Sequence, residues 1–215
     1  MPLAGRPMVE WSIVALRACV AIDSIVVACP PGHAHGLDAE DIVLVDGGAT
    51  RSDSVSNALA VVETEVLAIH DAARPLVAPE LIEGVIATLL ADPEADGAIA
   101  AAPVADTIKQ VTATEAADGM RPPFSISGMQ KGGRIVESTL DRGRLWGAQT
   151  PQVFRVEALR RALEAYPDDA PPATDEAMLV EATGGRVLIH PSPVENLKVT
   201  TQFDLRLAEL LLAAR

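Results

Sequence analysis

An aspartate and an arginine stand directly after a short apolar run, and both could act on a phosphorylated ligand. The run at residues 66–69 is too short for a helix and predicts a buried strand, which Pro75 brings to an end. Asp71 and Arg74 are therefore expected at the carboxyl end of an interior strand, where ligands bind in open α/β sheets. Asp71 could orient a hydroxyl or a metal-bound water, and Arg74 could hold a phosphate through two N–H bonds. The alternative is an Asp–Arg pair that only ends the strand.

A glycine-rich turn between a predicted strand and a predicted helix is the second candidate. Gly47 and Gly48 let the backbone come close to a ligand, and the following helix offers free N–H groups to an anion or a base edge. Arg51 and Ser54 would add side-chain donors. Many such turns only reverse the chain, so the turn alone does not identify a ligand.

Four further polar residues lie near the ends of predicted elements. Thr107 directly follows an apolar strand, and Arg142 stands beside a glycine in a basic turn that suits phosphate binding. Thr174 begins a predicted helix, where it could cap the helix or face a ligand. Lys198 follows a strand and could place a positive charge in a cleft. An ordinary loop, a solvated turn, a helix cap and a solvated lysine would explain the same residues without a ligand.

The composition fits one α/β domain with an aliphatic core. The 215 residues are 49% hydrophobic and 3% aromatic, so the core must be built from Ala, Val, Leu and Ile. The net charge of −13 argues against nucleic-acid binding, but a local group of cations still permits a small anionic substrate. No apolar run approaches the ~18 residues of a membrane span and no signal peptide is recognisable, so we expect a cytoplasmic protein without a membrane partner.

The cysteine and histidine spacings predict no metal site. Cys19 and Cys29 lie in apolar segments and are expected as buried free thiols. None of the four histidines has the spacing of a zinc motif; they are His33, His35, His70 and His190.

The elements that must position these residues alternate along the chain. Helical periodicity predicts helices over residues 8–20, 52–62, 79–90, 156–165, 175–182 and 203–214. Short β-rich runs predict strands over residues 24–29, 42–45, 66–69, 97–104, 107–111, 135–140 and 186–189. This order predicts a mostly parallel sheet covered by helices on both faces, within a single domain spanning residues 1–215. Thr150-Pro151 is expected to form a rigid bend.

Residues 106–145 differ from the rest of the chain in their pattern of polar and apolar residues, and this pattern predicts a β-arm within that domain. Two short strands flank a long polar stretch that includes residues 116–133. A two-stranded arm cannot bury both of its faces alone, so we expect it to pack against another chain as a dimer contact.

Taken in chain order, the polar motifs resemble one enzyme family over nearly the whole sequence. They are Gly47-Gly48 with Arg51 and Ser54-Val55, His70-Asp71-Ala72-Ala73-Arg74-Pro75, Asp106-Thr107-Ile108-Lys109, Leu145-Trp146 with Gln149-Thr150-Pro151-Gln152, Thr174-Asp175-Glu176-Ala177, and Asn196-Leu197-Lys198-Val199-Thr200. This pattern resembles the 2-C-methyl-D-erythritol 4-phosphate cytidylyltransferases of the non-mevalonate isoprenoid pathway. The resemblance implies a Rossmann-like α/β domain, CTP and methylerythritol phosphate as substrates, release of pyrophosphate, Mg²⁺ bound mainly through the nucleotide phosphates, and a homodimer formed through the β-arm.

The resemblance also implies a role for each candidate residue. Lys198 would stabilise charge on the α-phosphate, and Asp71 would hold substrate and metal-bound groups at the reaction centre. Four residues would bind the methylerythritol phosphate, those of the arm being donated by the partner subunit: Arg74, Thr107, Arg142 and Thr174. Gly48, Arg51 and Ser54 would line the cytosine and ribose pocket, and Ala72 would lie nearby. Gly47 would also belong to the nucleotide-binding residues.

One departure from the family pattern leaves other hypotheses open. The family begins with a strand and a glycine-rich loop carrying an arginine and a lysine, whereas residues 1–7 resemble the segment just after that loop. We therefore expect a gap in the parallel sheet. A second hypothesis is a catalytically impaired paralogue that acts as a binding or dimer-partner protein. A third is a related cytidylyltransferase that uses another polyol phosphate, such as ribitol phosphate.

Overall fold

The computed structural model describes residues 2–32, 37, 40–112, 134–167, 169–171 and 173–214. His33, His35 and the long polar stretch 116–133 lie outside the described residues. The chain divides into two compact units, one formed by Met1–Ala102 with Ala148–Arg215 and the other by Pro103–Gly147. None of the described helices has the length and apolar composition needed to cross a membrane.

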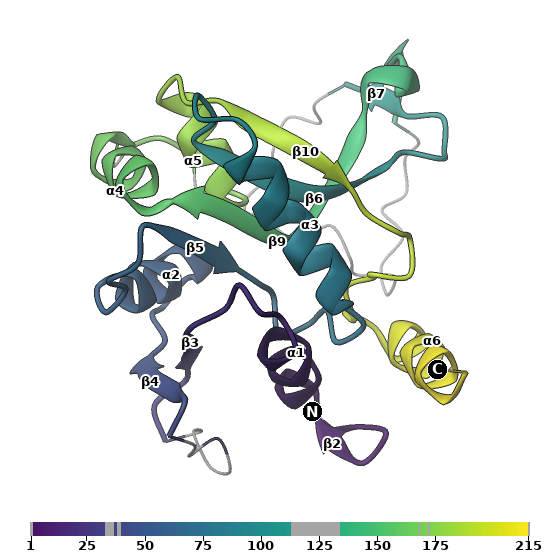
Figure 1. Cartoon of the computed structure of the whole chain (residues 1–215). Helices are drawn as coiled ribbons and strands as arrows, with labels where there is room; N and C mark the ends of the chain where they lie inside the picture. Colours follow the sequence, from purple (N-terminus) through teal and green to yellow (C-terminus); the bar gives the residue numbers. More distant parts are fainter. Residues whose placement is uncertain are drawn as a thin grey trace. The chain divides into compact units, whose positions relative to one another are not determined.

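The first unit alternates strands and helices along the chain (Figure 1). Its elements are β1 (Pro2–Leu3), β2 (Arg6–Pro7), α1 (Met8–Arg17), β3 (Ile25–Cys29), β4 (Ile42–Asp46), α2 (Arg51–Leu59), β5 (Val66–Ile69), α3 (Pro79–Leu90), β6 (Gly97–Pro103), β9 (Trp146–Arg155), α4 (Val156–Ala165), α5 (Glu176–Ala182), β10 (Val187–Pro191) and α6 (Gln202–Ala213). The predicted bounds of β5, α3 and α4 are confirmed residue for residue, while α1 and α2 end three residues earlier than predicted.

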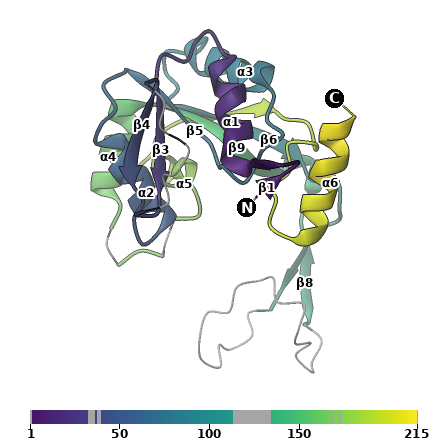
Figure 2. The ribbon, with the colours of Figure 1, turned by 90° about the horizontal axis from the view of Figure 1, so that it is seen from below.

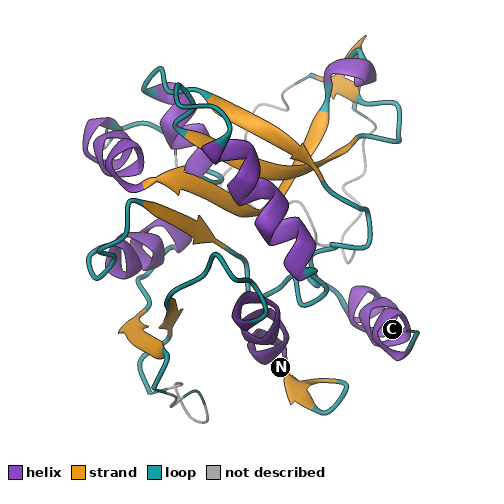
Figure 3. Ribbon diagram, in the orientation of Figure 1, coloured by secondary structure: helices purple, strands orange, loops and turns teal. Residues whose placement is uncertain are grey.

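Helices pack on both faces of a four-stranded sheet with the order β10-β6-β9-β5 (Figure 3). Successive side chains of a strand point to opposite faces. Ala98 and Ala100 of β6 accordingly pack with the apolar side of α3, while Ile99 packs with α4 and α5. The predicted α/β class with helices on both faces is therefore confirmed. The sheet is mixed, because β6 and β10 run parallel whereas β9 runs antiparallel to β5.

Strand β9 was not predicted, and Thr150-Pro151, expected as a rigid bend, is joined by a cis peptide bond inside this strand. Both residues lie inside β9, and Val153 and Phe154 later in the strand are fully buried. Proline lacks the N–H that a central strand normally donates, so its presence argues against a strand in the sequence. The apolar side chains that follow it are packed between α3 on one face and α4 with α5 on the other. Their burial stabilises the strand in spite of the proline.

The expected gap in the sheet lies between β3 and β5. Within the described part of the chain, β3 pairs only with β4, and β5 pairs only with β9 (Figure 1). A cavity of about 810 Å³ separates the two strands, lined by both of them and by α1 and α2. Both cysteines are free, with Cys19 buried as expected and Cys29 half-buried.

The ends of the first unit pack together. Helix α6 lies beside β1 (Figure 2), and Ala208 of α6 shares an apolar cluster with Leu3, Leu76 and Val199. Leu76 follows the Asp71–Arg74 segment, and Val199 follows Lys198. This cluster therefore anchors the two segments that carry the charged candidate residues.

The second unit contains a short antiparallel strand pair. Strands β7 (Lys109–Val111) and β8 (Val136–Thr139) pair in the register Lys109↔Thr139. The Lys109 ammonium donates to the Thr139 hydroxyl at 2.6 Å. The 3₁₀ turn η1 (Arg142–Arg144) follows β8. Both predicted strands of the arm are present, with shorter bounds than predicted.

Candidate active site

Asp71 lies at the centre of a cluster of three cations. It lies two residues after Ile69, the last residue of β5, as expected for a ligand-binding strand end. Its carboxylate lies 2.9 Å from the Lys198 ammonium, 3.4 Å from Arg51 Nε and 3.9 Å from Arg74 Nε. The sequence spacing of Asp71 and Arg74 was recognisable, but Arg51 and Lys198 come from distant segments that only the fold brings together.

The cations keep Asp71 ionised in a partly buried position. Burial alone would raise the pKa of Asp71, but the hydrogen bond and charge of Lys198, together with Arg51 and Arg74, hold that pKa below its ordinary value. Burial also lowers the pKa of the Arg74 guanidinium, an effect that Asp71 partly offsets. An arginine stays charged even so. The cluster thus presents three positive charges and one negative charge at neutral pH.

These residues line a small polar pocket of about 230 Å³. Its lining residues are Arg51, Asp71, Arg74, Ala148, Gln149, Thr150, Gln152, Thr174, Asp175 and Lys198. The larger cavity between β3 and β5 also reaches Arg51 and Asp71, together with Ser54 and Ala72. Arg51 and Asp71 therefore border both cavities.

A chain of hydrogen bonds through His70 fixes the Asp71 backbone. The Asp71 N–H donates to Thr150 Oγ1 at 3.0 Å, and Thr150 Oγ1 lies 3.0 Å from His70 Nδ1. His70 Nε2 lies 3.1 Å from the carbonyl oxygen of Arg74, which can only accept. His70 therefore donates from Nε2 and accepts the Thr150 hydroxyl at Nδ1. Burial lowers the pKa of His70 to about 4, although the Arg74 carbonyl and Asp71 oppose this shift, so the ring is neutral at pH 7.

A second network through Asn196 ties the Lys198 segment to the same strand end. The buried Asn196 amide donates to Gln149 Oε1 at 2.8 Å and to the Thr150 carbonyl at 2.9 Å. In return, Arg74 Nη1 donates to the Asn196 carbonyl at 2.8 Å. The segment that carries Lys198 and the segment that carries Arg74 therefore hold each other in position.

The glycine turn precedes α2, which carries Arg51. Thr50 caps the helix and forms a capping box with Asp53. The Gly48 N–H donates to Ser54 Oγ at 3.0 Å, and Ser54 Oγ donates to the Thr50 carbonyl at 3.0 Å. A Cβ atom at Gly48 would lie 2.1 Å from the Asp53 Cβ, so the turn has no room for a larger residue. The turn thus sets the start of the helix that positions Arg51.

The structure brings together some of the predicted site residues and leaves others apart. Arg51, Asp71, Arg74, Thr174 and Lys198 share one pocket. Ser54 and Ala72 border the larger cavity instead, and Gly47 and Gly48 line neither of these two cavities. Thr107 and Arg142 belong to the second unit, where Arg142 Nη1 donates to the Ala105 carbonyl. The cap of α5 is Asp175 rather than Thr174, since the Asp175 carboxylate accepts from the Met178 N–H.

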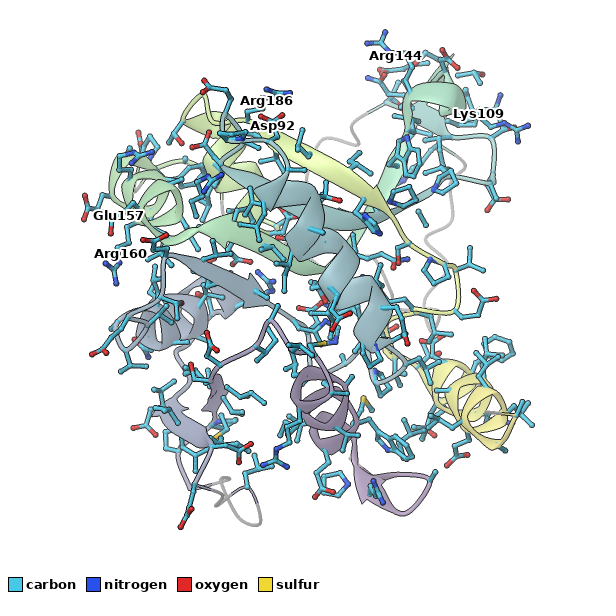
Figure 4. All side chains as sticks on the ribbon, in the orientation of Figure 1. Asp92, Lys109, Arg144, Glu157, Arg160 and Arg186 are labelled. Atoms are coloured by element: carbon cyan, nitrogen blue, oxygen red, sulfur yellow. The ribbon has the colours of Figure 1, made fainter. Side chains whose placement is uncertain are left out.

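Sequence reasoning did not select several residues that build the site: His70, Thr150, Asn196 and Glu176. The Glu176 carboxylate, whose side chain is 1% exposed, pairs with Arg51 Nη1. By contrast, Arg160 pairs with Glu157 through exposed side chains, and the exposed Arg186 pairs with the half-buried Asp92 (Figure 4). Each of these four residues belongs to a motif quoted above, so the sequence did contain a signal for them. Their polarity alone does not show which side chains are buried in the site and which are exposed.

Among the described residues, no group of three or more His, Cys, Asp or Glu side chains lies close enough together to hold a metal ion. Asp71 is a carboxylate that borders both cavities. A metal at this site would therefore need most of its ligands from a substrate.

The family model described as "IspD: 2-C-methyl-D-erythritol 4-phosphate cytidylyltransferase" matches residues 1–121 and 125–214. The chain belongs to this family. A 2-C-methyl-D-erythritol 4-phosphate cytidylyltransferase from Ralstonia nicotianae is 39% identical over 228 residues, which covers 99% of this chain and 83% of the relative. One from Saccharopolyspora erythraea is 37% identical and covers 99% of this chain and 89% of the relative.

The solved structures agree with this membership in the cytidylyltransferase family. The crystal structure of 2-C-methyl-D-erythritol 4-phosphate cytidylyltransferase from Thermus thermophilus is 30% identical with a TM-score of 0.76, covering 99% of this chain and 92% of that chain. The resemblance found in the sequence is thus confirmed over nearly the whole chain. The cytidylyltransferase family consists of nucleotidyltransferases, and this chain is an enzyme of that class.

Proposed function

We propose that this chain transfers the cytidylyl group of CTP to 2-C-methyl-D-erythritol 4-phosphate and releases pyrophosphate, as a step in making isoprenoid precursors. The observation that carries the proposal is the polar pocket of about 230 Å³ in which Lys198, Arg51 and Arg74 converge on Asp71. Transfer of a nucleotidyl group between two phosphorylated substrates needs several cations at one centre. The family membership then supplies the identity of the two substrates.

The reaction asks the protein to position charges rather than to form covalent bonds. A phosphate oxygen of the acceptor attacks the α-phosphorus of CTP, a new P–O bond forms, and the bond to the β-phosphate breaks with its electron pair leaving on pyrophosphate. No proton transfer is required, because a phosphate monoester is largely ionised at pH 7. Catalysis of this kind depends on in-line placement and on cations at the phosphate oxygens.

Lys198 and Asp71 are the proposed catalytic pair. The Lys198 side chain is 45% exposed and reaches the pocket, so its ammonium can contact a phosphate oxygen. Asp71 lies 2.9 Å away and holds the ammonium in the smaller pocket. We assign to Lys198 the stabilisation of charge that develops at the α-phosphate.

The remaining residues divide between the two substrates. Arg74 and Thr174 line the smaller pocket, which fits the acceptor phosphate. The nucleotide is assigned to the residues of the turn before α2 and of the segment after β5: Gly47, Gly48, Arg51, Ser54 and Ala72. Thr107 and Arg142 are proposed to bind the acceptor from a partner subunit.

The residues fit a magnesium ion that arrives with the nucleotide. Mg²⁺ is commonly held by one or two carboxylates together with substrate phosphates, and Asp71 is a carboxylate that borders both cavities. When bound, the ion supplies positive charge that neutralises the triphosphate.

We also propose that the unit Pro103–Gly147 contributes a contact in a homodimer. Its paired strands β7 and β8 form a two-stranded sheet, which is marginally stable alone. Ile135, Val136 and Trp146 expose 71%, 53% and 39% of their surface, and all three belong to this unit because β9 begins within it. A second copy of the chain would bury such side chains. Light scattering of the purified chain checks this, with a mass of two chains expected.

A substrate panel tests the proposed reaction. The full chain is incubated with CTP, Mg²⁺ and one of two acceptors, and pyrophosphate release is followed. We expect release with 2-C-methyl-D-erythritol 4-phosphate. Release with ribitol phosphate alone would identify a different acceptor, and CTP binding without release from either would identify a binding protein. Both of those outcomes contradict the proposal.

A further inference from the structure

Glu176 is a buried carboxylate that lies behind the site rather than in it. It is the first residue of α5, its side chain is 1% exposed, and it lines neither of the two cavities. One carboxylate oxygen accepts from Arg51 Nη1. The other is buried and has no hydrogen-bond partner in the described structure. The buried negative charge of Glu176 is therefore balanced by Arg51.

The pair joins two segments that are 125 residues apart in the chain. The position of Glu176 is fixed by the start of α5, where Asp175 accepts from the Met178 N–H and also from Gln152 Nε2 at 2.8 Å. Gln152 belongs to β9 and is buried. The contact between Gln152 of the sheet and Asp175 thus fixes the position of the neighbouring Glu176 carboxylate.

Arg51 is held between two carboxylates. Its Nη1 donates to Glu176, and its Nε lies 3.4 Å from Asp71. Burial alone would lower the pKa of Arg51, but Glu176 first and Asp71 second raise it above its ordinary value. Two contacts on different nitrogens fix the plane of the guanidinium, which borders both cavities.

Loss of the Glu176 charge would change how the Asp71 carboxylate is divided between its partners Arg51 and Lys198. Arg51 would keep Asp71 as its remaining carboxylate partner within the described residues. Asp71 already contacts Lys198 at 2.9 Å and Arg74 at 3.9 Å. Arg51 would then compete with Lys198 for the same carboxylate. Glu176 therefore holds Arg51 in place and limits its competition with Lys198 for Asp71.

We propose that Glu176 is a positioning residue for nucleotide binding, acting through its buried ion pair with Arg51. The inference rests on the proposed function, in which Arg51 belongs to the nucleotide site. Glu176 itself touches no substrate. Its effect on the reaction passes through the orientation of one guanidinium.

The experiment compares Glu176→Gln with the wild-type full chain. The variant keeps the shape of the side chain and removes its charge. We expect the Kd of CTP with Mg²⁺, measured by calorimetry, to rise about tenfold, which corresponds to ~1.4 kcal/mol. The KM of CTP should rise with it, while the KM of the acceptor stays within about twofold, since Arg51 is assigned to the nucleotide. Glu176→Asp retains the charge and should recover part of the affinity.

Glu157→Gln is the matched control, because it removes a carboxylate from an exposed pair with Arg160, in which the Glu157 side chain is 74% exposed. It should leave CTP affinity unchanged. A double-mutant cycle with Arg51→Ala isolates the coupling. Once Arg51 is absent, Glu176→Gln should weaken CTP binding no further.

Three outcomes would overturn the inference. One is an unchanged CTP affinity in Glu176→Gln while Arg51→Ala loses affinity. Another is an equal further loss when Glu176→Gln is added to Arg51→Ala, which shows that the two residues act independently. If the wild-type chain binds no CTP, the proposed function fails and the inference fails with it, so the wild-type measurement separates the two cases. Should Glu176→Gln not fold, a cycle of Glu176→Asp with Arg51→Lys tests the geometry of the pair instead of its charge, and strictly additive losses of CTP affinity would contradict the inference.

Discussion

Asp71 stays charged because three cations outweigh the cost of its partial burial. Burial raises its pKa, and Lys198, Arg51 and Arg74 together bring that pKa below its ordinary value. The Asp71 carboxylate in turn reduces the repulsion among the three cations. A phosphate that enters the pocket can replace Asp71 as the partner of one or more of these cations, so the cluster is suited to anionic substrates.

Removing the Lys198 ammonium tests its role in the transition state. Lys198→Ala is expected to lower kcat about 100-fold with KM values within a few-fold, because a group that acts on developing charge contributes little to ground-state binding. Steady-state kinetics with CTP and the acceptor measure the two effects separately. Lys198→Arg, which keeps the charge, should retain part of the rate. A large rise in KM with an unchanged kcat would assign Lys198 to binding instead.

His70 predicts a pH dependence of stability. Burial lowers its pKa to about 4 from an ordinary value of 6.5. Between these values the unfolded chain binds more protons than the folded chain, so the free energy of unfolding rises with pH across this window. The contribution is complete above the ordinary value and is lost as the pH falls to about 4, amounting to at most ~3 kcal/mol.

Urea unfolding of wild type and His70→Gln at pH 7, 5.5 and 4.5 measures this contribution. The variant lacks the titrating ring, so its stability should change less across the window. The lowered pKa of Asp71 acts at more acidic pH, below its own ordinary value, and does not obscure the comparison. Equal pH slopes in the two proteins would show that His70 is not held neutral by burial.

At the scale of elements, the turn before α2 connects backbone geometry to the position of Arg51. Gly48 closes this turn against Asp53, while Gly47 has only ordinary contacts at 3.4 Å. The two glycines therefore offer a matched pair of substitutions within one turn.

Gly48→Ala should disturb the turn, and Gly47→Ala should not. The new Cβ at Gly48 would lie 2.1 Å from the Asp53 Cβ, which requires the turn or the start of α2 to shift. We expect a loss of about 1–3 kcal/mol in stability and weaker CTP binding. Gly47→Ala should stay within about 0.5 kcal/mol of wild type. Thermal unfolding and calorimetry check both variants, and equal behaviour of the two would contradict the assigned role of the turn.

The elements that the sequence predicts well are those with a clear period. The helix at Pro79–Leu90 has proline at its first position and apolar residues at helical spacing, and its predicted bounds are confirmed. Strand β9 was missed because Pro151 and the polar side chains around it hide a central strand whose apolar part is short. Asp71 and Arg74 could be found from their place after β5. Glu176 and Asn196 could not, since only the fold decides that these polar side chains are buried.

At the scale of the whole molecule, strand β6 of the four-stranded sheet and the separate pair β3–β4 differ in how well neighbouring elements bury them. Residues Ala98, Ala100 and Ala101 of β6 are at most 1% exposed, with a paired strand on each side. Strands β3 and β4 pair only with each other among the described strands, and the cavity of about 810 Å³ lies between β3 and β5. The first unit thus has a strongly buried half and a more open half.

Hydrogen exchange should report this difference. Amides of β3 and β4 are expected to exchange through local opening at a lower free energy than amides of β6, because a two-stranded pair has fewer neighbours to hold it. Mass spectrometry of the exchanging chain resolves the two regions. Equal protection in β3 and β6 would mean that the cavity does not weaken the sheet.

The most direct test of the central claim follows the α-phosphorus of labelled CTP. The full chain is incubated with the labelled nucleotide, Mg²⁺ and 2-C-methyl-D-erythritol 4-phosphate. We predict that the label moves to the acceptor, that pyrophosphate is released unlabelled, and that Asp71→Asn and Lys198→Ala slow the transfer. Label that remains in CTP, or that appears in CMP equally with and without the acceptor, would contradict the proposed transfer.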